Sequence, residues 1–369
     1  MKFCLYTISI SPHQIPLAEE LVKLLGADEY RYVYIRDMSK DRRQLGWSAR
    51  RPDWMISAKS EEAQRWLREA DVVMAGERNV DLFEERSRRG LKTLYCSERW
   101  FKPLKWGLDG RLRMLSPSYR RRARAIMDLV RRDLNFVLYP IGIHAARDFA
   151  WLLGCRISDF EHIPGGLLRG KGRYLDKMRM WGYFVAPSSQ AEGRSARSSS
   201  ICAAQRPLRV LWVGRMLHLK RVDTIIRAVA HVCKRGGIIQ LTLVGDGPEK
   251  HRLQALARKL DLAVTFMTPV PIDQVRDLMR RHDVYVLSSN AYEGWGAVVS
   301  EAIEEGMAVL GTQEAGSTAT ILDRTRLYPA GDVQSLASRL MSIDTAGQSG
   351  GSWSARAAAE TIVRECSLL

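Results

Sequence analysis

From residue 208 onward, short apolar runs alternate with amphipathic stretches of helical length. The runs include LRVLWVG and DVYVLSS, and the turn Gly245-Asp246-Gly247-Pro248 ends one of them with a proline suited to the first turn of a helix. This alternation predicts βαβ units and a parallel sheet that is covered on both faces. The expected helices are 219–234, 248–260, 271–282, 296–306 and 333–342.

The first half of the chain alternates in the same way, with longer irregular insertions. Residues 187–207 contain almost no large apolar side chain, so they read as a linker. The sequence therefore predicts an α/β protein with two doubly wound, Rossmann-like domains, residues 1–186 and 208–345, and a ligand cleft facing the carboxyl ends of both sheets. A tail, 346–369, is expected to carry a helix that packs back on the first domain. Expected strands are 2–8, 30–35, 71–75, 91–96 and 135–139, and expected helices are 13–25, 60–69, 80–89, 117–132 and 144–153.

Two glutamates stand close to a predicted strand end in the second domain. A strand ends near Ser288, and the loop after it carries Glu293-Gly294-Trp295-Gly296, with Glu301 on the second turn of the next predicted helix. Each carboxylate can accept paired hydrogen bonds from a sugar diol, and a helix start suits a phosphate. Glycines let the backbone approach a ligand. The alternative is an N-cap glutamate and an unrelated glutamate on a helix surface.

Two cations follow the first strand of the same domain. Arg215 comes directly after Gly214, and Lys220 lies five residues further on, where a helix begins. Cations at a helix start oppose the helix dipole by about 0.3–1 kcal/mol each. That cost favours a functional role, such as neutralising a diphosphate leaving group, over a merely basic N-cap region.

Three segments in this order carry a family resemblance: VGRMLHLK, LVGDGPEKHRLQALA and EGWGAVVSEAIEEGMAVLGT. Over residues 208–342 the chain resembles family 4 retaining glycosyltransferases of the GT-B fold, and among them members that act on bacterial surface polysaccharides. The resemblance implies that Arg215 and Lys220 bind the donor diphosphate and that Glu301 holds the ribose hydroxyls. It also implies that Gly316 lies near the phosphates, although Ala315 stands where a paired glycine is usual.

The resemblance implies that Glu293, with the backbone at Gly294 and Trp295, faces the transferred sugar. The first domain follows the family less closely. It lacks the usual glycine-rich loop after its first strand and the usual histidine after a middle strand. His13 and Glu98 stand at the comparable positions, and they are the candidates to touch donor sugar or acceptor. For His13, a histidine at a helix start without a ligand role is the alternative.

The predicted activity is transfer of a hexose from a UDP- or GDP-sugar, with retention, to a glycan or lipid-linked acceptor in surface polysaccharide or glycoconjugate biosynthesis. No cofactor or metal is expected, because the six cysteines are scattered, no DxD motif occurs and two cations stand ready for the leaving group. The alternatives are another GT-B enzyme, an epimerase or a phosphorylase, and a nucleic-acid-binding protein.

The net charge of +16 is concentrated in residues 97–132, which hold eleven basic and three acidic residues. Such a field attracts anionic partners. The charge lacks the aromatic pattern, zinc spacing or recognition helix of a nucleic-acid-binding module, so no nucleic acid is expected. No apolar run approaches the ~20 residues that span a bilayer. The sequence thus predicts a cytoplasmic protein that binds the anionic inner face of the cytoplasmic membrane peripherally through residues 99–132. The alternative is a solvated basic helix face whose arginines pair with acidic residues elsewhere in the fold.

Overall fold

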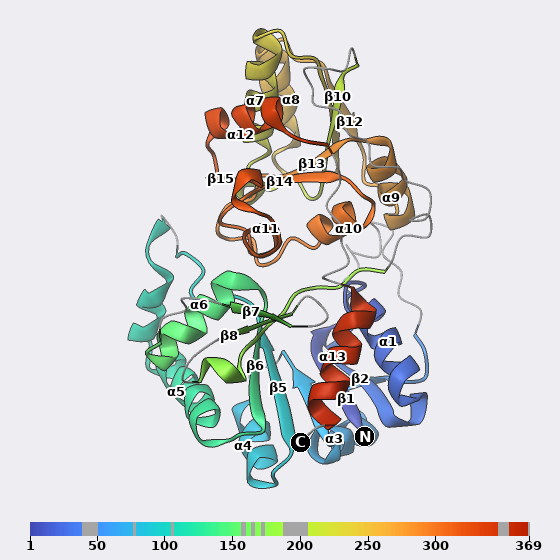
Figure 1. Cartoon of the computed structure of the whole chain (residues 1–369), viewed down its shortest axis with the longest axis vertical. Coiled ribbons are helices and arrows are strands. Elements are labelled where there is room, and N and C mark those ends of the chain that lie inside the picture. The colour runs from blue at the N-terminus through green and yellow to red at the C-terminus, as the bar shows by residue number, and fades with distance from the viewer. Residues whose placement is uncertain are drawn as a thin grey trace. The chain divides into compact units, whose positions relative to one another are not determined.

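The computed structural model describes residues 1–38, 51–76, 79–104, 107–155, 160–163, 167–170, 174–186, 206–345 and 354–367. They divide into two units (Figure 1). The first unit contains the described residues up to 186 together with the helix α13 (Ala355–Ser367), and the second contains residues 206 to 345. Most of the expected linker lies outside the described residues.

Each unit is built around a six-stranded sheet with parallel pairing, and the strand order is the same in both. Along the chain this order is third, second, first, fourth, fifth, sixth, so the direction of winding reverses between the first and fourth strands. The α/β class is confirmed. The first sheet contains β3 (Met55–Ser57), β2 (Tyr30–Arg36), β1 (Phe3–Ser9), β4 (Val72–Ala75), β5 (Lys92–Ser97) and β6 (Phe136–Pro140), and the second contains β12 (Val264–Met267), β11 (Ile239–Val244), β10 (Leu208–Val213), β13 (Val284–Leu287), β14 (Ala308–Thr312) and β15 (Leu327–Tyr328).

The second sheet is buried on both faces, as its unbroken apolar strands require. Along β10, Val210 and Trp212 belong to one core cluster and Leu211 to another. The first cluster lies under α7 and α12, and the second lies under α9 and α10 (Figure 1). The helices of this unit are α7 (Val222–Lys234), α8 (Lys250–Lys259), α9 (Ile272–Arg281), α10 (Val298–Glu304), α11 (Gly316–Ile321) and α12 (Val333–Ser342).

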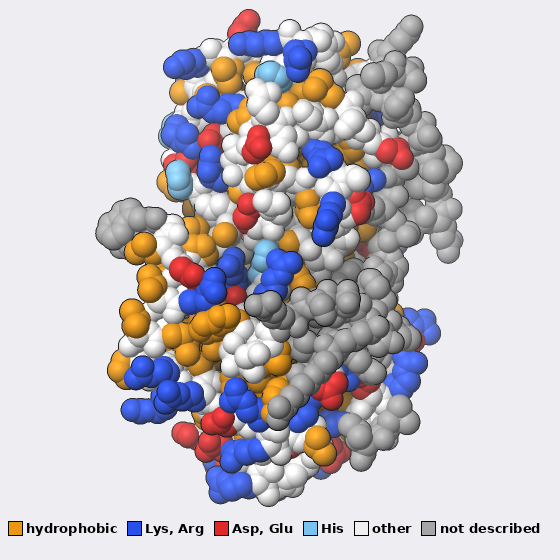
Figure 2. Space-filling view, turned by 60° about the vertical axis from the view of Figure 1, so that its left-hand side comes forward, with side chains coloured by type: hydrophobic (Ala, Val, Ile, Leu, Met, Phe, Trp, Pro, Cys, Tyr) orange, Lys and Arg blue, Asp and Glu red, His pale blue; other side chains and the backbone are white. Residues whose placement is uncertain are grey.

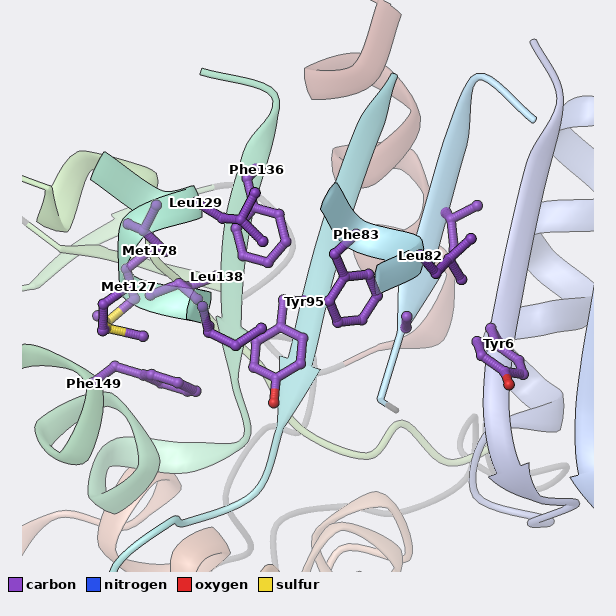
Figure 3. Packing of buried hydrophobic residues seen from close by; sticks show 14 of the residues in the cluster. Tyr6, Leu82, Phe83, Tyr95, Met127, Leu129, Phe136, Leu138, Phe149 and Met178 are labelled. Atoms are coloured by element: carbon purple, nitrogen blue, oxygen red, sulfur yellow. The ribbon is translucent and has the colours of Figure 1, made fainter. Parts of the chain in front are cut away.

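The core of the first unit is aromatic at its centre. Tyr95 on β5 is surrounded by Phe83, Phe136 and Phe149 (Figure 3), with ring centroids 5.6, 6.0 and 6.0 Å away, respectively. Aromatic rings at such distances gain about 0.5–1.5 kcal/mol per pair beyond their burial. The helices of this unit are α1 (Ile15–Leu25), α3 (Glu61–Glu69), α4 (Val80–Arg88), α5 (Pro117–Arg132), α6 (Gly142–Leu153) and α13.

The helix α13 packs along α1 (Figure 1). Its small buried face, with Ala358 and Ile362 fully buried, permits this close packing. Glu365 accepts from the Arg179 guanidinium at 2.9 Å, and the Lys92 ammonium donates to the Glu365 carbonyl oxygen at 3.3 Å. These contacts tie the end of the described chain to Lys92 at the start of β5 and to Arg179 near the end of the first unit.

Several elements differ from the sequence-based expectation. The strand β3 has three residues, too few for a recognisable apolar run. A small antiparallel sheet of β7 (Phe160–Ile163), β8 (Leu167–Gly170) and β9 (Arg179–Met180) was also not predicted. The helix α10 begins at Val298, two residues later than expected. No helix of the described chain combines the length and apolar character that crossing a membrane requires.

Candidate functional site

The candidate site of the second unit lies where the winding of its sheet reverses. β10 pairs with β11 on one side and with β13 on the other. Ligands of open α/β sheets bind at the carboxyl ends of the strands beside such a reversal. Arg215 and Lys220 follow β10, and Glu293 follows β13. The three residues therefore belong to the two loops that adjoin this point.

Close backbone approaches hold the loops in place. A Cβ atom on Gly245 would overlap the Gly214 carbonyl oxygen, and one on Gly247 would overlap the Met216 carbonyl oxygen. The Met216 amide donates to the Asp246 carbonyl oxygen at 2.7 Å, which joins the loop after β10 to the loop after β11. Only glycine permits this proximity, so the expected turn at 245–248 has a packing reason as well as a turn-forming one.

Lys220 and Glu293 meet across the two loops. The Lys220 ammonium pairs with Glu293 Oε2, and the Ser289 hydroxyl donates to the same oxygen at 2.8 Å. The side chains of Lys220 and Glu293 are 21% and 14% exposed, respectively. The N-cap of α10 is Ala297, so Glu293 is not the N-cap glutamate of the alternative interpretation.

The loop that contains Glu293 is braced by the start of α11. A Cβ atom on Gly316 would overlap the Gly294 carbonyl oxygen, and the Ser317 amide donates to the Trp295 carbonyl oxygen at 2.9 Å. The Trp295 side chain is 1% exposed and lies in the core. The indole ring of Trp295 is therefore part of the core and is not available to stack on a ligand.

Glu301 is buried on the first turn of α10 and not on the second, because the helix begins later than expected. Its exposed fraction is 5%, which excludes the interpretation as a surface glutamate. Burial raises the pKa of Glu301 to about 7, with Glu305 adding to the rise and the Arg276 guanidinium opposing it. Glu305 is paired with Arg276 at 3.3 Å and with Arg280 at 2.9 Å.

Arg215 differs from Lys220 in its surroundings. Its side chain is exposed, and within the described residues it has no side-chain hydrogen bond or ion pair. An arginine fork without a protein partner is available to an anion such as a phosphate. Among the residues that the structure describes, Arg215 is thus a cation without a partner in this site, and Lys220 is a cation already neutralised by a carboxylate.

The first unit brings its two candidate residues together through a third. The Tyr183 hydroxyl donates to Glu98 Oε1 at 3.3 Å, and the Lys102 ammonium binds Glu98 Oε2 at 2.9 Å. The rings of His13 and Tyr183 lie 6.3 Å apart. These four residues, called here the first-unit cluster, combine an aromatic surface with a charged pair.

Among the residues that the structure describes, no three His, Cys, Asp or Glu side chains gather as they would around a metal ion. The polar groups of both regions are instead lysine, arginine, glutamate, tyrosine and serine, with one histidine, His13. Their chemistry is that of hydrogen bonding and charge neutralisation.

Comparison with known families gives a match in the second unit. The family model described as "Glycosyl transferases group 1" matches residues 199–355. This stretch contains all the second-unit residues discussed above.

Residues 199–355 are a group 1 glycosyltransferase domain.

The match to curated relatives spans only part of each relative's length. The chain is 28% identical over 209 residues to the GDP-mannose-dependent alpha-(1-6)-phosphatidylinositol monomannoside mannosyltransferase of Mycolicibacterium smegmatis, covering 54% of this chain and 50% of that protein. It is 31% identical over 122 residues to the putative glycosyltransferase EpsF of Bacillus subtilis, covering 33% of this chain and 31% of that protein. It is 27% identical over 140 residues to the gpi3 subunit of phosphatidylinositol N-acetylglucosaminyltransferase of Schizosaccharomyces pombe, covering 37% and 30%, respectively. The chain thus spans at most half the length of each of these relatives.

Solved structures show the fold of the whole chain. Anabaena HepE in complex with UDP has a TM-score of 0.61 at 16% identity, covering 100% of both chains. The lipopolysaccharide outer core galactosyltransferase WaaB has a TM-score of 0.60 at 14% identity, covering 92% of this chain and 89% of that chain. Together with the two sheets of equal strand order, these likenesses identify the GT-B fold.

Sequence reasoning missed three residues of these regions. Ser289 of the glycosyltransferase domain and Lys102 and Tyr183 of the first-unit cluster all bind a candidate glutamate. A serine at a strand end and a lysine four residues after a glutamate are too common to stand out. Tyr183 reaches Glu98 across 85 positions of sequence, and no local pattern reports such a contact.

Proposed function

We propose that the chain is a retaining hexosyltransferase that uses a UDP- or GDP-sugar donor. The observation that supports this most is the meeting of Lys220 and Glu293 at the reversal point of a glycosyltransferase-domain sheet, with Arg215 in the same loop as Lys220 and Glu301 buried on the adjacent helix. A cation pair suits the diphosphate of a nucleotide sugar, and carboxylates suit the hydroxyls on either side of it.

The residues take separate parts of the donor in this proposal. Arg215 and Lys220 bind the diphosphate, and Glu301 accepts hydrogen bonds from the ribose. Glu293 and the backbone of Gly294 and Trp295 face the transferred hexose, while Gly316 keeps the loop close. HepE has been crystallised with UDP and with UDP-glucose, and the mycobacterial relative is named for GDP-mannose, which supports the donor class and leaves both bases open.

The proposed chemistry is a displacement on one face of the sugar. The bond from the anomeric carbon to the diphosphate oxygen breaks, the acceptor oxygen bonds to the same face, and the departing phosphate oxygen takes the acceptor proton. The protein stabilises the negative charge that develops on the diphosphate, and two preorganised cations in a partly buried site do this without a metal ion.

A panel of nucleotide sugars tests the proposal. UDP-glucose, UDP-galactose, UDP-N-acetylglucosamine and GDP-mannose are each incubated with the protein, and release of the nucleoside diphosphate is measured with and without EDTA. We expect one donor to stand out and its turnover to survive EDTA. Loss that Mg²⁺ or Mn²⁺ restores contradicts the metal-free mechanism. Product analysis with labelled donor distinguishes transfer from epimerisation and phosphorolysis.

We further propose that the acceptor is a glycan or lipid-linked sugar bound by the first unit, beside an anionic membrane surface on the cytoplasmic side. Hydrophobic and basic side chains lie next to each other on the face of the first unit in Figure 2. The 3-10 helix at Gly110–Leu115 contributes Leu112 and Leu115, which are 44% and 76% exposed. Phe101 lies in the same stretch of sequence but is 3% exposed, so it does not contribute to this surface. Other exposed residues here are Leu108, Trp151, Arg111, Arg120, Arg121 and Arg124.

Exposed arginines near an anionic leaflet contribute about 1 kcal/mol each, and exposed leucines add interfacial burial. Co-sedimentation with vesicles of anionic or neutral lipid tests this surface. We expect binding that needs anionic lipid and weakens as salt rises. Protein that remains in the supernatant with anionic vesicles at low salt favours an acceptor in solution. Binding to duplex DNA of comparable strength instead favours the nucleic-acid alternative.

A further inference from the structure

The Glu293 carboxylate has two partners, and they differ in how easily each can move away from it. Oε2 accepts from the Ser289 hydroxyl at 2.8 Å and is paired with the Lys220 ammonium. The lysine carries its charge on a flexible four-carbon stem with three donors. The serine is fully buried. One partner is therefore mobile, and the other is fixed.

The backbone around both partners is held. The Lys220 amide donates to the Leu217 carbonyl oxygen at 2.9 Å, and the Ser288 hydroxyl donates to the Lys220 carbonyl oxygen at 2.6 Å. The Thr312 hydroxyl donates to the Ser289 carbonyl oxygen at 2.6 Å. Because these bonds fix the main chain on each side, only the Lys220 side chain is able to change its partner easily.

A donor diphosphate competes for that side chain. It brings at least two negative charges to a loop where Lys220 is already neutralised by Glu293. When the ammonium turns to the phosphate, the carboxylate loses much of its pairing while remaining mostly buried, a situation that is costly unless other hydrogen bonds remain. The Ser289 hydroxyl is the bond that stays.

We propose that Ser289 is a positioning residue: its hydroxyl holds the Glu293 carboxylate toward the transferred sugar after the donor diphosphate has drawn Lys220 away. This inference rests on the proposed donor site and adds to it a change of partner. It has two separable consequences. Glu293 opposes binding of a bare nucleoside diphosphate, because both compete for one lysine, whereas Ser289 affects turnover without touching the phosphates.

The first test measures binding of UDP and GDP by calorimetry. For whichever nucleotide the wild-type chain binds, Glu293→Gln is expected to bind about threefold to tenfold more tightly, since the lysine no longer has a carboxylate to leave. Ser289→Ala is expected to bind within about twofold of wild type. Unchanged or weaker binding by Glu293→Gln overturns the partner exchange.

The second test measures turnover of the most active nucleotide sugar of the panel. Ser289→Ala is expected to lower kcat about tenfold or more with KM for the donor little changed. Without the serine hydroxyl, the Glu293 carboxylate is no longer held toward the reacting sugar. Ser300→Ala is the matched control. Ser300 is a buried serine of α10 whose hydroxyl has no hydrogen-bond partner in the described structure, and its loss is expected to leave turnover unchanged. Thermal unfolding shows whether either variant has lost its fold.

The outcomes separate the two proposals. Wild-type protein that binds neither UDP nor GDP removes the donor site, and the inference with it. Wild-type protein that binds and turns over a donor, with a Ser289→Ala variant as active as Ser300→Ala, leaves the donor site standing and overturns the role of Ser289. An equal loss of kcat in both serine variants also overturns it, because the loss then follows from a missing buried hydroxyl in general.

Discussion

The two units share one strand order but use the ends of their strands differently. In the second unit, glycines bring loops so close that backbone touches backbone, as at Gly245 against Gly214. In the first unit, the corresponding region is assembled from side chains, with Tyr183 and Lys102 converging on Glu98. The same sheet thus supports a rigid loop cradle, which suits a phosphate, and a side-chain cluster, which suits the varied hydroxyls of a sugar.

Each region contains a lysine–glutamate pair, and the two pairs differ in burial. Lys220 and Glu293 have side chains 21% and 14% exposed, against 32% and 36% for Lys102 and Glu98. Charge interactions weaken steeply as solvent enters. The pair in the second unit is therefore expected to matter more to chemistry, and the following predictions test that contrast.

The largest expected fall in kcat/KM follows from removing one of the two cations that we propose bind the diphosphate. Lys220→Ala or Arg215→Ala is expected to lower kcat/KM by about 10²–10³, as when one preorganised donor worth about 2.7–4 kcal/mol is removed. Lys102→Ala is the matched change in the first unit and should cost less than about tenfold. Initial rates of nucleotide release measure both. Equal losses at Lys220 and Lys102 contradict the functional difference between the units.

The next largest effects are expected from replacing the two glutamates of the second unit, which we propose to have different roles. Glu293→Ala is expected to lower kcat by about tenfold or more, because we propose that Glu293 faces the reacting sugar. Glu301→Ala is expected mainly to raise the donor KM, because a ribose contact is largely uniform binding. Full steady-state curves for the donor separate the two effects. The reverse pattern means that the roles are exchanged.

A pH dependence of about tenfold between pH 6 and pH 8 is expected for donor binding. Burial raises the pKa of Glu301 to about 7, and only the ionised carboxylate accepts both ribose hydrogen bonds. Binding of UDP-glucose, whose phosphates do not titrate in this range, should therefore strengthen as pH rises and lose that dependence in Glu301→Gln. Glu98→Gln in the first unit should retain it.

The same pKa makes a prediction for stability. A carboxyl whose pKa is higher in the folded chain than in the unfolded chain destabilises the fold as pH rises from about 4.5 to about 7. Glu301→Gln is thus expected to unfold at a higher temperature than wild type at pH 8, and at a similar temperature near pH 4. A variant that is less stable at pH 8 would falsify the account of burial as the cause.

The smallest expected effect is in the first-unit cluster. Tyr183→Phe removes the hydroxyl that binds Glu98 and keeps the ring beside His13. We expect about a threefold rise in the acceptor KM, the cost of one net hydrogen bond, with nucleotide binding unchanged. Tyr183→Ala should raise it further, because the ring is lost as well. A change in UDP affinity in either variant contradicts a role confined to the acceptor.

Sequence reasoning reached the second unit more fully than the first for a physical reason. Arg215, Lys220 and Glu293 lie in loops directly after unbroken apolar strands, so strand periodicity alone predicts which edge of the sheet they share. The pairing of Lys220 with Glu293 follows from the adjacency of β10 and β13, which parallel winding makes common. The first-unit cluster depends on a contact between Tyr183 and Glu98, which lie in distant segments of the chain. The periodicity of apolar residues does not predict such a contact.

Burial was the other quantity that the sequence did not reveal. The sequence predicts that Glu301 lies on a helix beside the site, but not its near-complete burial, which depends on the packing around α10. Arg86 is a further case: it is fully buried, and its guanidinium donates to the carbonyl oxygens of Leu67, Ala70 and Lys92. An arginine on an exposed-looking helix pattern gives no sign that backbone carbonyls will enclose it.

The helix α13 makes the first unit discontinuous in the chain, and this affects how the protein is made. A ribosome adding about 5–20 residues per second completes α13 on the order of ten seconds after residue 186 has been added. During that interval α1 has no partner along the face that α13 later covers. Nascent first units therefore leave this face of α1 uncovered until the second unit and then α13 have been synthesised. We therefore expect a fragment that stops at residue 186 to be less stable than the same fragment supplied with α13.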